Sequence, residues 1–133
     1  VRLADFGLAV ILGDPDATRK CGTPGYSAPE VLSKSVVYYD CKVDCFSLGA
    51  VVYFLTTGTH AFKGATAAES MHKNKVARLN FPRGSMSAGA KAFIQALCTV
   101  DPVLRPSAGE VAQHEWIRGV SAARRNGTEA VAA

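Results

Sequence analysis

The stretch Val43-Asp44-Cys45-Phe46-Ser47-Leu48-Gly49-Ala50-Val51-Val52-Tyr53-Phe54-Leu55 decides the fold. From Cys45 to Phe62 the chain has no Lys, Arg, Asp or Glu, and at helical spacing its apolar side chains cover every face. A helix that is apolar all round is either a membrane span or the buried axis of a domain. A span needs roughly 20 predominantly apolar residues, and residues 56–60 interrupt this run. We therefore predict a central helix over about residues 42–57, with shorter amphipathic helices packed around it.

Length and composition predict a single globular domain. The chain has 133 residues, of which 48% are hydrophobic and 20% charged, enough to form a core. Its 15 basic residues exceed the 11 acidic ones by only four and form no run, so we expect no nucleic-acid partner. The four cysteines show no C-x-x-C spacing, although Cys41 and Cys45 could be neighbours on a helix. We expect buried thiols in a reducing, cytoplasmic compartment rather than metal ligands.

The first third of the chain alternates short apolar runs with turn residues. Residues 1–4 and 8–12 are each predicted to form a short strand, before a turn over residues 13–16. Residues 21–32 form a Gly/Pro-rich loop that enters a short helix, where Ser27 as N-cap and Glu30 at N3 would make a capping box. Asp5 alone is either a turn carboxylate or a Mg²⁺ ligand held at a strand end.

Three further helices are predicted from N-cap signals. Thr66 with Glu69 opens a helix to about residue 77, and Ser87 caps a helix to about residue 99. Ser107 with Glu110 is another capping box, leading to residue 116. Residues 118–133 are predicted to be a loose tail.

Five motifs occur in an order that resembles the eukaryotic protein kinase family. Asp5-Phe6-Gly7 followed by Ala28-Pro29-Glu30 resembles the activation segment. Asp44 to Gly49 resembles the D-x-W-S-L-G helix, with Phe46 in place of Trp. The remaining matched segments are Thr57–Gly64 (where Ala61 replaces a common proline), Asp101–Pro106 and His114–Ile117.

The resemblance covers residues 1–117 and implies a mostly α fold. That fold would be part of the C-terminal, larger lobe of the kinase-like α+β architecture, with short strands near the N-terminus and a tail over residues 118–133. The family covers one side of the central helix with a segment that precedes Asp-Phe-Gly. In this sequence only residues 1–4 precede Asp-Phe-Gly, which suggests a fragment. We therefore expect part of the surface of the central helix to be exposed.

The resemblance also assigns roles to residues around the Gly-Thr-Pro-Gly-Tyr loop. Thr23 would contact the catalytic Asp and Lys, and the pocket for the substrate residue beside the phosphoacceptor would be lined by Pro24, Gly25 and Tyr26. This loop resembles that of Ser/Thr kinases rather than Tyr kinases. The family's activation-loop Thr position is occupied by Arg19, which makes the neighbouring Thr18 a candidate phosphosite.

Three further residues receive structural or metal-binding roles from the resemblance. Glu30 and Arg105 would form a buried ion pair, the alternative being that Glu30 only caps its helix and Arg105 is a surface charge. Asp44 would hold the backbone of the catalytic loop, and Asp5 would bind Mg²⁺. The His-x-Trp-Ile ending resembles the calcium/calmodulin-dependent group, which implies a calcium sensor or regulatory segment as a partner.

The residues that carry phosphoryl transfer in this family are absent from the sequence. It contains no H-R-D, no G-x-G-x-x-G and no V-A-I-K equivalent. No catalytic residue is therefore assigned, and the base is expected upstream of Val1. The expected parent is a Ser/Thr kinase that uses ATP and Mg²⁺ on protein substrates. The alternatives are a degenerate, non-catalytic lobe that serves as an interaction module, and a single-span membrane protein.

Overall fold

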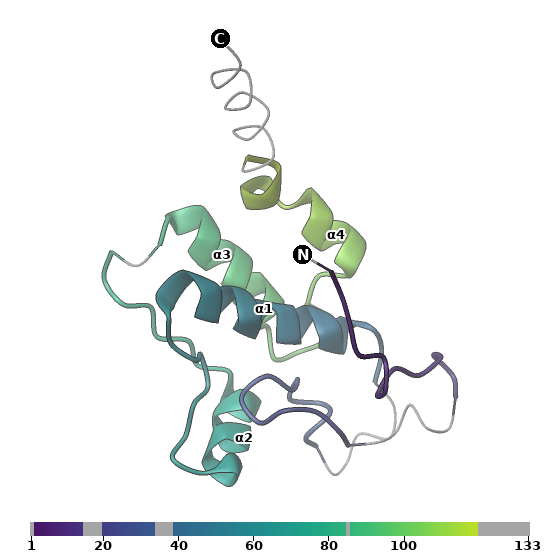
Figure 1. Cartoon of the computed structure of the whole chain (residues 1–133). Helices are drawn as coiled ribbons and strands as arrows, with labels where there is room; N and C mark the ends of the chain where they lie inside the picture. The colour runs from purple at the N-terminus through teal and green to yellow at the C-terminus, as the bar shows by residue number, and fades with distance from the viewer. Residues whose placement is uncertain (1, 15–19, 34–38, 85, 120–133) are drawn as a thin grey trace.

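The computed structural model describes residues 2–14, 20–33, 39–84 and 86–119, and its regular structure there is helical (Figure 1). The helices are α1 (Lys42–Thr57), α2 (Ala67–Val76), α3 (Ala88–Leu97) and α4 (Ala108–Gln113). Helix α1 crosses the middle of the molecule (Figure 1). Helices α3 and α4 both contact α1, and α2 lies on the other side of α1 from α3.

Helix α1 confirms the predicted central helix. Asp40 begins it by accepting a hydrogen bond from the Lys42 N–H at 2.8 Å, and the helix ends where the Gly58 N–H bonds to the Phe54 carbonyl at 2.8 Å. The apolar run to Phe62 is thus divided between a helix and a loop. None of the described helices is long and apolar enough to cross a membrane.

Two apolar clusters join α1 to the other elements. The larger one unites α1 with the loops on either side of it and with α3, and its buried members are Ala28, Val31, Phe46, Ala50, Tyr53, Phe62, Ile94 and Cys98. The smaller one links α1 to α3 and α4, through Cys45, Phe93, Leu97 and Val111. Gly49 explains the close approach of α1 and α3, because a Cβ there would lie 2.7 Å from the Cys98 Sγ and 2.8 Å from the Leu97 Cβ.

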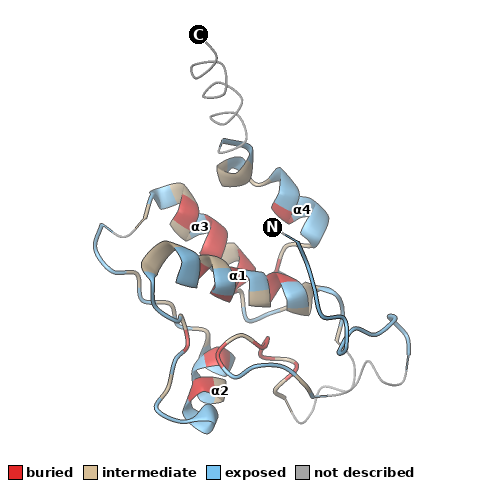
Figure 2. Ribbon diagram, in the orientation of Figure 1, coloured by how far each residue is buried: buried red, intermediate tan, exposed pale blue. Residues whose placement is uncertain are grey.

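The opposite side of α1 is exposed. Leu48, Val51, Phe54 and Leu55 are all exposed, and Leu55 retains 74% of its accessible surface. Figure 2 shows the resulting alternation of buried and exposed residues along α1. An all-round apolar helix is therefore buried on one side only in this chain.

The predicted N-terminal strands are absent from residues 2–14. Backbone hydrogen bonds there close only turns, from Ala9 to Phe6 and from Asp14 to Ile11. A strand needs a partner for its backbone groups and a surface for its side chains. Neither is available to this segment among the described residues, since its large side chains are exposed, Leu3 by 88% and Ile11 by 81%.

The predicted short helix and capping box at Ser27 are also wrong. Residues 28–33 form successive turns with hydrogen bonds between residues three apart, such as Val31 to Ala28. The Ser27 Oγ donates backwards to the Thr23 carbonyl at 3.2 Å, and Glu30 bonds to Arg105 instead of to a helix N-terminus. A strong charged partner elsewhere in the chain outcompetes the local cap.

The other three N-caps lie where the sequence predicts them. The Thr66, Ser87 and Ser107 hydroxyls each accept a hydrogen bond from an N–H three residues later. Ser107 and Glu110 form the full capping box. In the case of Thr66, the carboxylate of Glu69 bonds instead to the N–H of Ala65 at 2.8 Å.

Helix α4 ends three residues earlier than predicted. His114 leaves the helical conformation, with φ −58° and ψ 136°, and its Nδ1 accepts from the Trp116 N–H at 3.2 Å to start a new turn over residues 115–119. The break places the rings of His114 and Trp116 about 5 Å from the Phe93 ring, at 5.0 and 5.1 Å. Of the predicted tail, residues 120–133 lie outside the described residues.

Candidate functional site

The Gly-Thr-Pro-Gly-Tyr segment folds into a tight loop, residues 22–27, which we call the platform loop. The Thr23 carbonyl accepts hydrogen bonds from the Tyr26 N–H at 3.1 Å and from the Ser27 Oγ at 3.2 Å. Gly22 has φ 123°, and a Cβ there would lie 2.6 Å from the Ser27 Oγ. The loop therefore requires glycine at its first position, both for its backbone conformation and for space.

The platform loop rests on three other elements. From α1, the Ser47 Oγ donates to the Tyr26 carbonyl at 3.0 Å. From α2, the buried Asn74 donates through its Nδ2 to the Ser27 carbonyl at 2.7 Å. From the loop after α1, the His60 Nδ1 shares a hydrogen bond of 2.8 Å with the Tyr26 hydroxyl.

These attachments leave one side of the loop open. Thr23 and Pro24 are exposed, Tyr26 is half-buried, and Gly25 is buried. The loop thus presents a short exposed surface at Thr23 and Pro24, next to residues that are held by hydrogen bonds. Thr18, the candidate phosphosite, lies outside the described residues.

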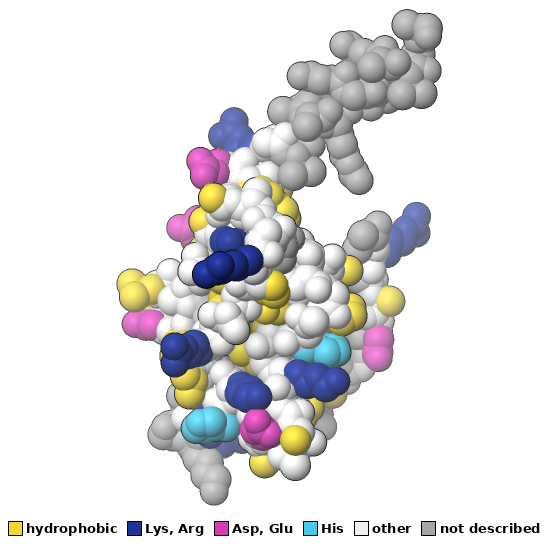
Figure 3. Space-filling model, turned by 90° about the vertical axis from the view of Figure 1, so that its left-hand side faces the viewer, with side chains coloured by type: hydrophobic (Ala, Val, Ile, Leu, Met, Phe, Trp, Pro, Cys, Tyr) yellow, Lys and Arg dark blue, Asp and Glu magenta, His cyan; other side chains and the backbone are white. Residues whose placement is uncertain are grey.

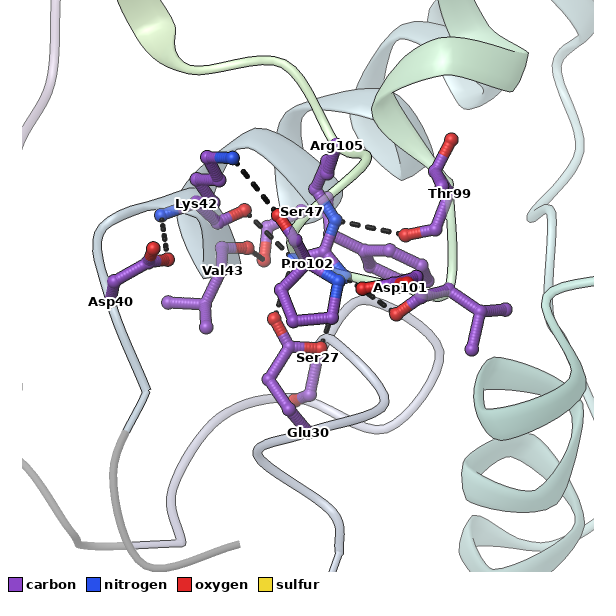
Figure 4. A network of polar contacts seen from close by, with 12 residues as sticks. Ser27, Glu30, Asp40, Lys42, Val43, Ser47, Thr99, Asp101, Pro102 and Arg105 are labelled. Carbon is purple, nitrogen blue, oxygen red and sulfur yellow. Dashed lines mark hydrogen bonds and ion pairs between the residues drawn. The ribbon is translucent and has the colours of Figure 1, made fainter.

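Glu30 and Arg105 form a bidentate ion pair beneath the platform loop (Figure 4). The Arg105 Nη1 lies 2.5 Å from the Glu30 Oε1, and its Nη2 lies 3.0 Å from Oε2. The Arg105 side chain has no exposed surface, and that of Glu30 retains 8%. The residues are 75 positions apart, so the pair ties the turn after the platform loop to the segment between α3 and α4.

Every N–H of the Arg105 guanidinium has an acceptor. Besides Glu30, the carbonyls of Thr99, Lys42 and Val100 accept at 2.9, 3.0 and 3.2 Å. The guanidinium carbon also lies 5.1 Å from the centre of the Phe46 ring, within the range of a cation–π contact. Full satisfaction of this kind is what allows an arginine to be buried.

Lys42 adds a second link at the same place (Figure 4). Its Nζ donates to the carbonyls of Pro102 and Val103 at 3.0 and 3.3 Å. The first residue of α1 is therefore fixed to the loop that carries Arg105 by both its carbonyl and its side chain. This brings three of the matched motifs together at the N-terminal end of α1.

A cavity of about 560 Å³ opens beside the platform loop. Residues 8–10 and 12, parts of the platform loop and of the turns after it, the segment before α1 and one side of α1 line the cavity. Its polar lining includes Thr23, Asp44 and Ser47. Asp44 is exposed in the first turn of α1. Asp44 therefore lines the cavity and is also accessible to solvent.

Asp5 lies in the exposed N-terminal stretch and does not belong to that lining. Its φ is 63°, and its Oδ1 accepts from the Gly7 N–H at 3.2 Å. Within the described part of the chain, no group of three or more His, Cys, Asp or Glu side chains is placed to hold a metal ion. Asp5 could thus supply one ligand to Mg²⁺, but these residues alone do not form a Mg²⁺ site.

The cysteines are two buried and two accessible thiols. Burial raises the pKa of the Cys98 thiol to about 12, and burial is also the main cause of the raised pKa of Cys45. Cys41 is exposed and Cys21 half-buried. The buried thiols are protonated at neutral pH and act as small core residues, which suits neither nucleophilic nor metal chemistry.

Sequence reasoning did not identify the residues that hold the platform loop. Ser47 belongs to the quoted D-x-W-S-L-G match and could have been singled out from that motif. Asn74 and His60 carry no such signal, because their partners lie 47 and 34 residues away along the chain. Only the folded arrangement of α1 and α2 brings them to the loop.

Comparison with known proteins agrees with this arrangement. Residues 1–117 match the model of the protein kinase domain. The chain is 40% identical over 125 residues to a probable myosin light chain kinase of Dictyostelium discoideum, covering 88% of this chain and 40% of that protein. It is 36% identical over 129 residues to a calcium/calmodulin-dependent protein kinase of Emericella nidulans, covering 93% and 31%. With a probable serine/threonine-protein kinase of Zea mays the identity is 35% over 124 residues, covering 91% and 20%.

The chain therefore belongs to the eukaryotic protein kinase family, as the ordered motifs predict. It is a mostly helical part of a protein kinase domain and spans about two fifths, or less, of the length of these relatives. Kinase domains of this family use ATP and Mg²⁺ in general.

Proposed function

We propose that this chain is the C-terminal part of a Ser/Thr protein kinase domain and that it supplies the surface on which a protein substrate rests. The observation that carries the proposal is the platform loop, which leaves Thr23 and Pro24 exposed while hydrogen bonds from α1, α2 and the loop after α1 hold Tyr26 and Ser27. A peptide that must present one hydroxyl to ATP needs a rigid support of this kind.

Each matched residue takes one role in this proposal. Thr23 contacts the catalytic residues through its hydroxyl, and Pro24, Gly25 and Tyr26 line the pocket for the substrate residue beside the acceptor. Asp44 holds the catalytic loop, and its place in the lining of the open cavity supports this role. Asp5 positions Mg²⁺ once ATP and the rest of the domain are present. Thr18 remains a candidate phosphosite.

The reaction is transfer of the ATP γ-phosphoryl group to a Ser or Thr hydroxyl of a protein. The base, the phosphate-binding Lys and the glycine-rich loop must come from sequence other than these residues. We place the protein in the cytoplasm, and the calcium/calmodulin-dependent relative favours control by a calcium sensor or regulatory segment. The alternative function is a non-catalytic kinase lobe used for docking.

The test uses the longest gene product that contains this chain. Its transfer of radiolabel from ATP to matched Ser, Thr and Tyr peptides is measured, with Asp5→Ala and Thr23→Val as variants and Thr23→Ser as the conservative control. We expect Ser and Thr but not Tyr peptides to be labelled, with Thr23→Ser retaining activity that Thr23→Val loses. Absence of transfer from a well-folded product would favour the docking function instead.

A further inference from the structure

Charge is distributed unevenly along this chain. Residues 58–100 contain six Lys or Arg residues and only one acidic residue, a net charge of +5. The remaining 90 residues contain nine basic and ten acidic residues, a net charge of −1. The excess positive charge of the protein therefore comes from the segment that contains α2 and α3.

Four of these cations belong to α2 and its flanks, and we call them the α2 basic surface: Lys63, Lys73, Lys75 and Arg78. Lys63 and Lys73 are adjacent, since the Lys73 Nζ donates to the Lys63 carbonyl at 2.9 Å. Arg78 directly follows the residue that caps α2. All four side chains are exposed. Figure 3 shows Lys and Arg side chains gathered on the lower half of one face of the molecule.

Glu69 neutralises only one of them. It forms an ion pair of 3.0 Å with Lys73, and its other oxygen accepts from the Ala65 N–H. That backbone N–H, and then Lys73, lower the pKa of the Glu69 carboxyl, so it is ionised at neutral pH. Among the described residues, Lys63, Lys75 and Arg78 form no ion pair with an acidic side chain. Within the described part of the chain, three cations on this surface are therefore without a counter-charge.

The α2 basic surface borders the platform loop. Asn74, which holds the Ser27 carbonyl, lies between Lys73 and Lys75 in α2. Lys63 follows Phe62, whose carbonyl oxygen lies 3.8 Å from the position that a Cβ of Gly25 in the platform loop would occupy. A helix with its side chains is roughly 10 Å across, and an extended peptide covers about 3.3 Å per residue. A few residues of substrate would therefore span from the loop to these cations.

We propose that the α2 basic surface binds an acidic segment of a protein partner that lies a few residues from the residue seated on the platform loop. The proposal rests on the proposed function and adds the class of substrate. Three unneutralised cations beside a peptide-binding loop complement carboxylates, and such complementarity governs association rate and partner choice. Binding to nucleic acid rests on neutralising many phosphates with Lys and Arg, and three cations supply few such contacts.

The test is peptide binding by the chain fused to an inert soluble carrier, with the carrier alone as blank. The probe is a fluorescein-labelled peptide with one Ser followed by a run of Glu, compared with its counterpart in which Gln replaces Glu. Fluorescence anisotropy is measured at low and at physiological salt. We expect the Glu peptide to bind more tightly, with the difference shrinking as salt rises.

The decisive variant is Lys63→Gln with Lys75→Gln and Arg78→Gln. It should lose about tenfold in affinity for the Glu peptide, as expected of three exposed charge pairs, without a change for the Gln peptide. The charge-matched control replaces Arg118, Arg124 and Arg125 by Gln and should bind as the parent does. Because the three side chains are exposed, thermal melts of variant and parent should coincide.

Equal binding of the two peptides, or equal losses in the two triple variants, would overturn the proposal. The proposal would also be overturned if a single-stranded oligonucleotide displaced the labelled Glu peptide at a lower concentration than the unlabelled Glu peptide does. The measurement involves neither ATP nor transfer. A negative result therefore leaves the proposed kinase function intact, and a failed transfer assay leaves the binding result interpretable.

Discussion

Replacing Arg105 or Glu30 by Ala should destabilise the folded chain strongly, because each change strands the other charge. Glu30 would be left 8% exposed without its counter-ion, and Arg105 would keep three carbonyl partners but no anion in a site with no exposed surface. Breaking one half of a buried pair typically costs about 3–5 kcal/mol. Total domain stability is only about 5–15 kcal/mol, so either change removes a large share of it.

The double variant separates a true pair from two independent effects. With both charges gone, no buried charge is left unpaired, so Arg105→Ala with Glu30→Ala should cost far less than the sum of the single changes. Urea or thermal melts of the four proteins measure this, and Glu30→Gln with Arg105→Lys replaces the Ala series if the latter fails to fold. The exposed Glu69–Lys73 pair is the matched control and should couple only weakly. Additive losses at Glu30 and Arg105 would refute the reasoning.

Three further outcomes are expected. The 133-residue chain alone should not transfer phosphate to any Ser/Thr peptide, since it lacks the base and the phosphate-binding Lys; labelling that Asp5→Ala abolishes would contradict this. At pH 8 a thiol reagent should modify Cys41 rapidly and Cys98 only on unfolding. Burial raises the pKa of the Cys98 thiol in the folded chain from 9.0 to about 12. The contribution of Cys98 to the free energy of unfolding should therefore be present below about pH 9 and lost as the pH rises toward 12. The chain alone should bind a hydrophobic dye and aggregate, whereas adding an upstream segment that covers the open side of α1 should suppress both. A sharp thermal melt of the chain alone without dye binding would contradict this expectation.

Local signals were enough to predict α1, α2 and α3 and the start of α4. The three hydroxyl caps at Thr66, Ser87 and Ser107 act within one helical turn, so neighbouring residues determine them. The end of α1 likewise follows from the Thr, Gly and His residues at 56–60, which interrupt the apolar run. Where a competing partner was distant, local reasoning failed, as at Glu30, whose capping role was displaced by Arg105 75 residues away.

The candidate site divides along the same line. The resemblance predicted a Glu30–Arg105 pair, and the structure brings these two side chains together in one bidentate contact. The substrate role of Thr23 to Tyr26 stays a prediction. The supports of the platform loop were not predictable from local sequence, because Asn74 and His60 lie 47 and 34 residues from their partners in the loop. The prediction of N-terminal strands was wrong because a strand needs a partner, and residues 2–12 have no partner strand among the described residues.

The two sides of α1 show why an apolar helix need not be a buried one. On one side, Gly49 allows α3 to approach closely and Phe46 packs beneath Arg105, so burial and the ion pair support each other. On the other, Leu48, Val51, Phe54 and Leu55 remain exposed. Leaving even one or two such side chains in water forgoes roughly 1.5–3 kcal/mol each, a substantial part of the stability of a small domain. Periodicity records which faces are apolar, but only the neighbouring elements determine which of those faces are covered. The open face and the cavity beside Asp44 share Val51, so the exposed apolar surface of α1 continues into that cavity.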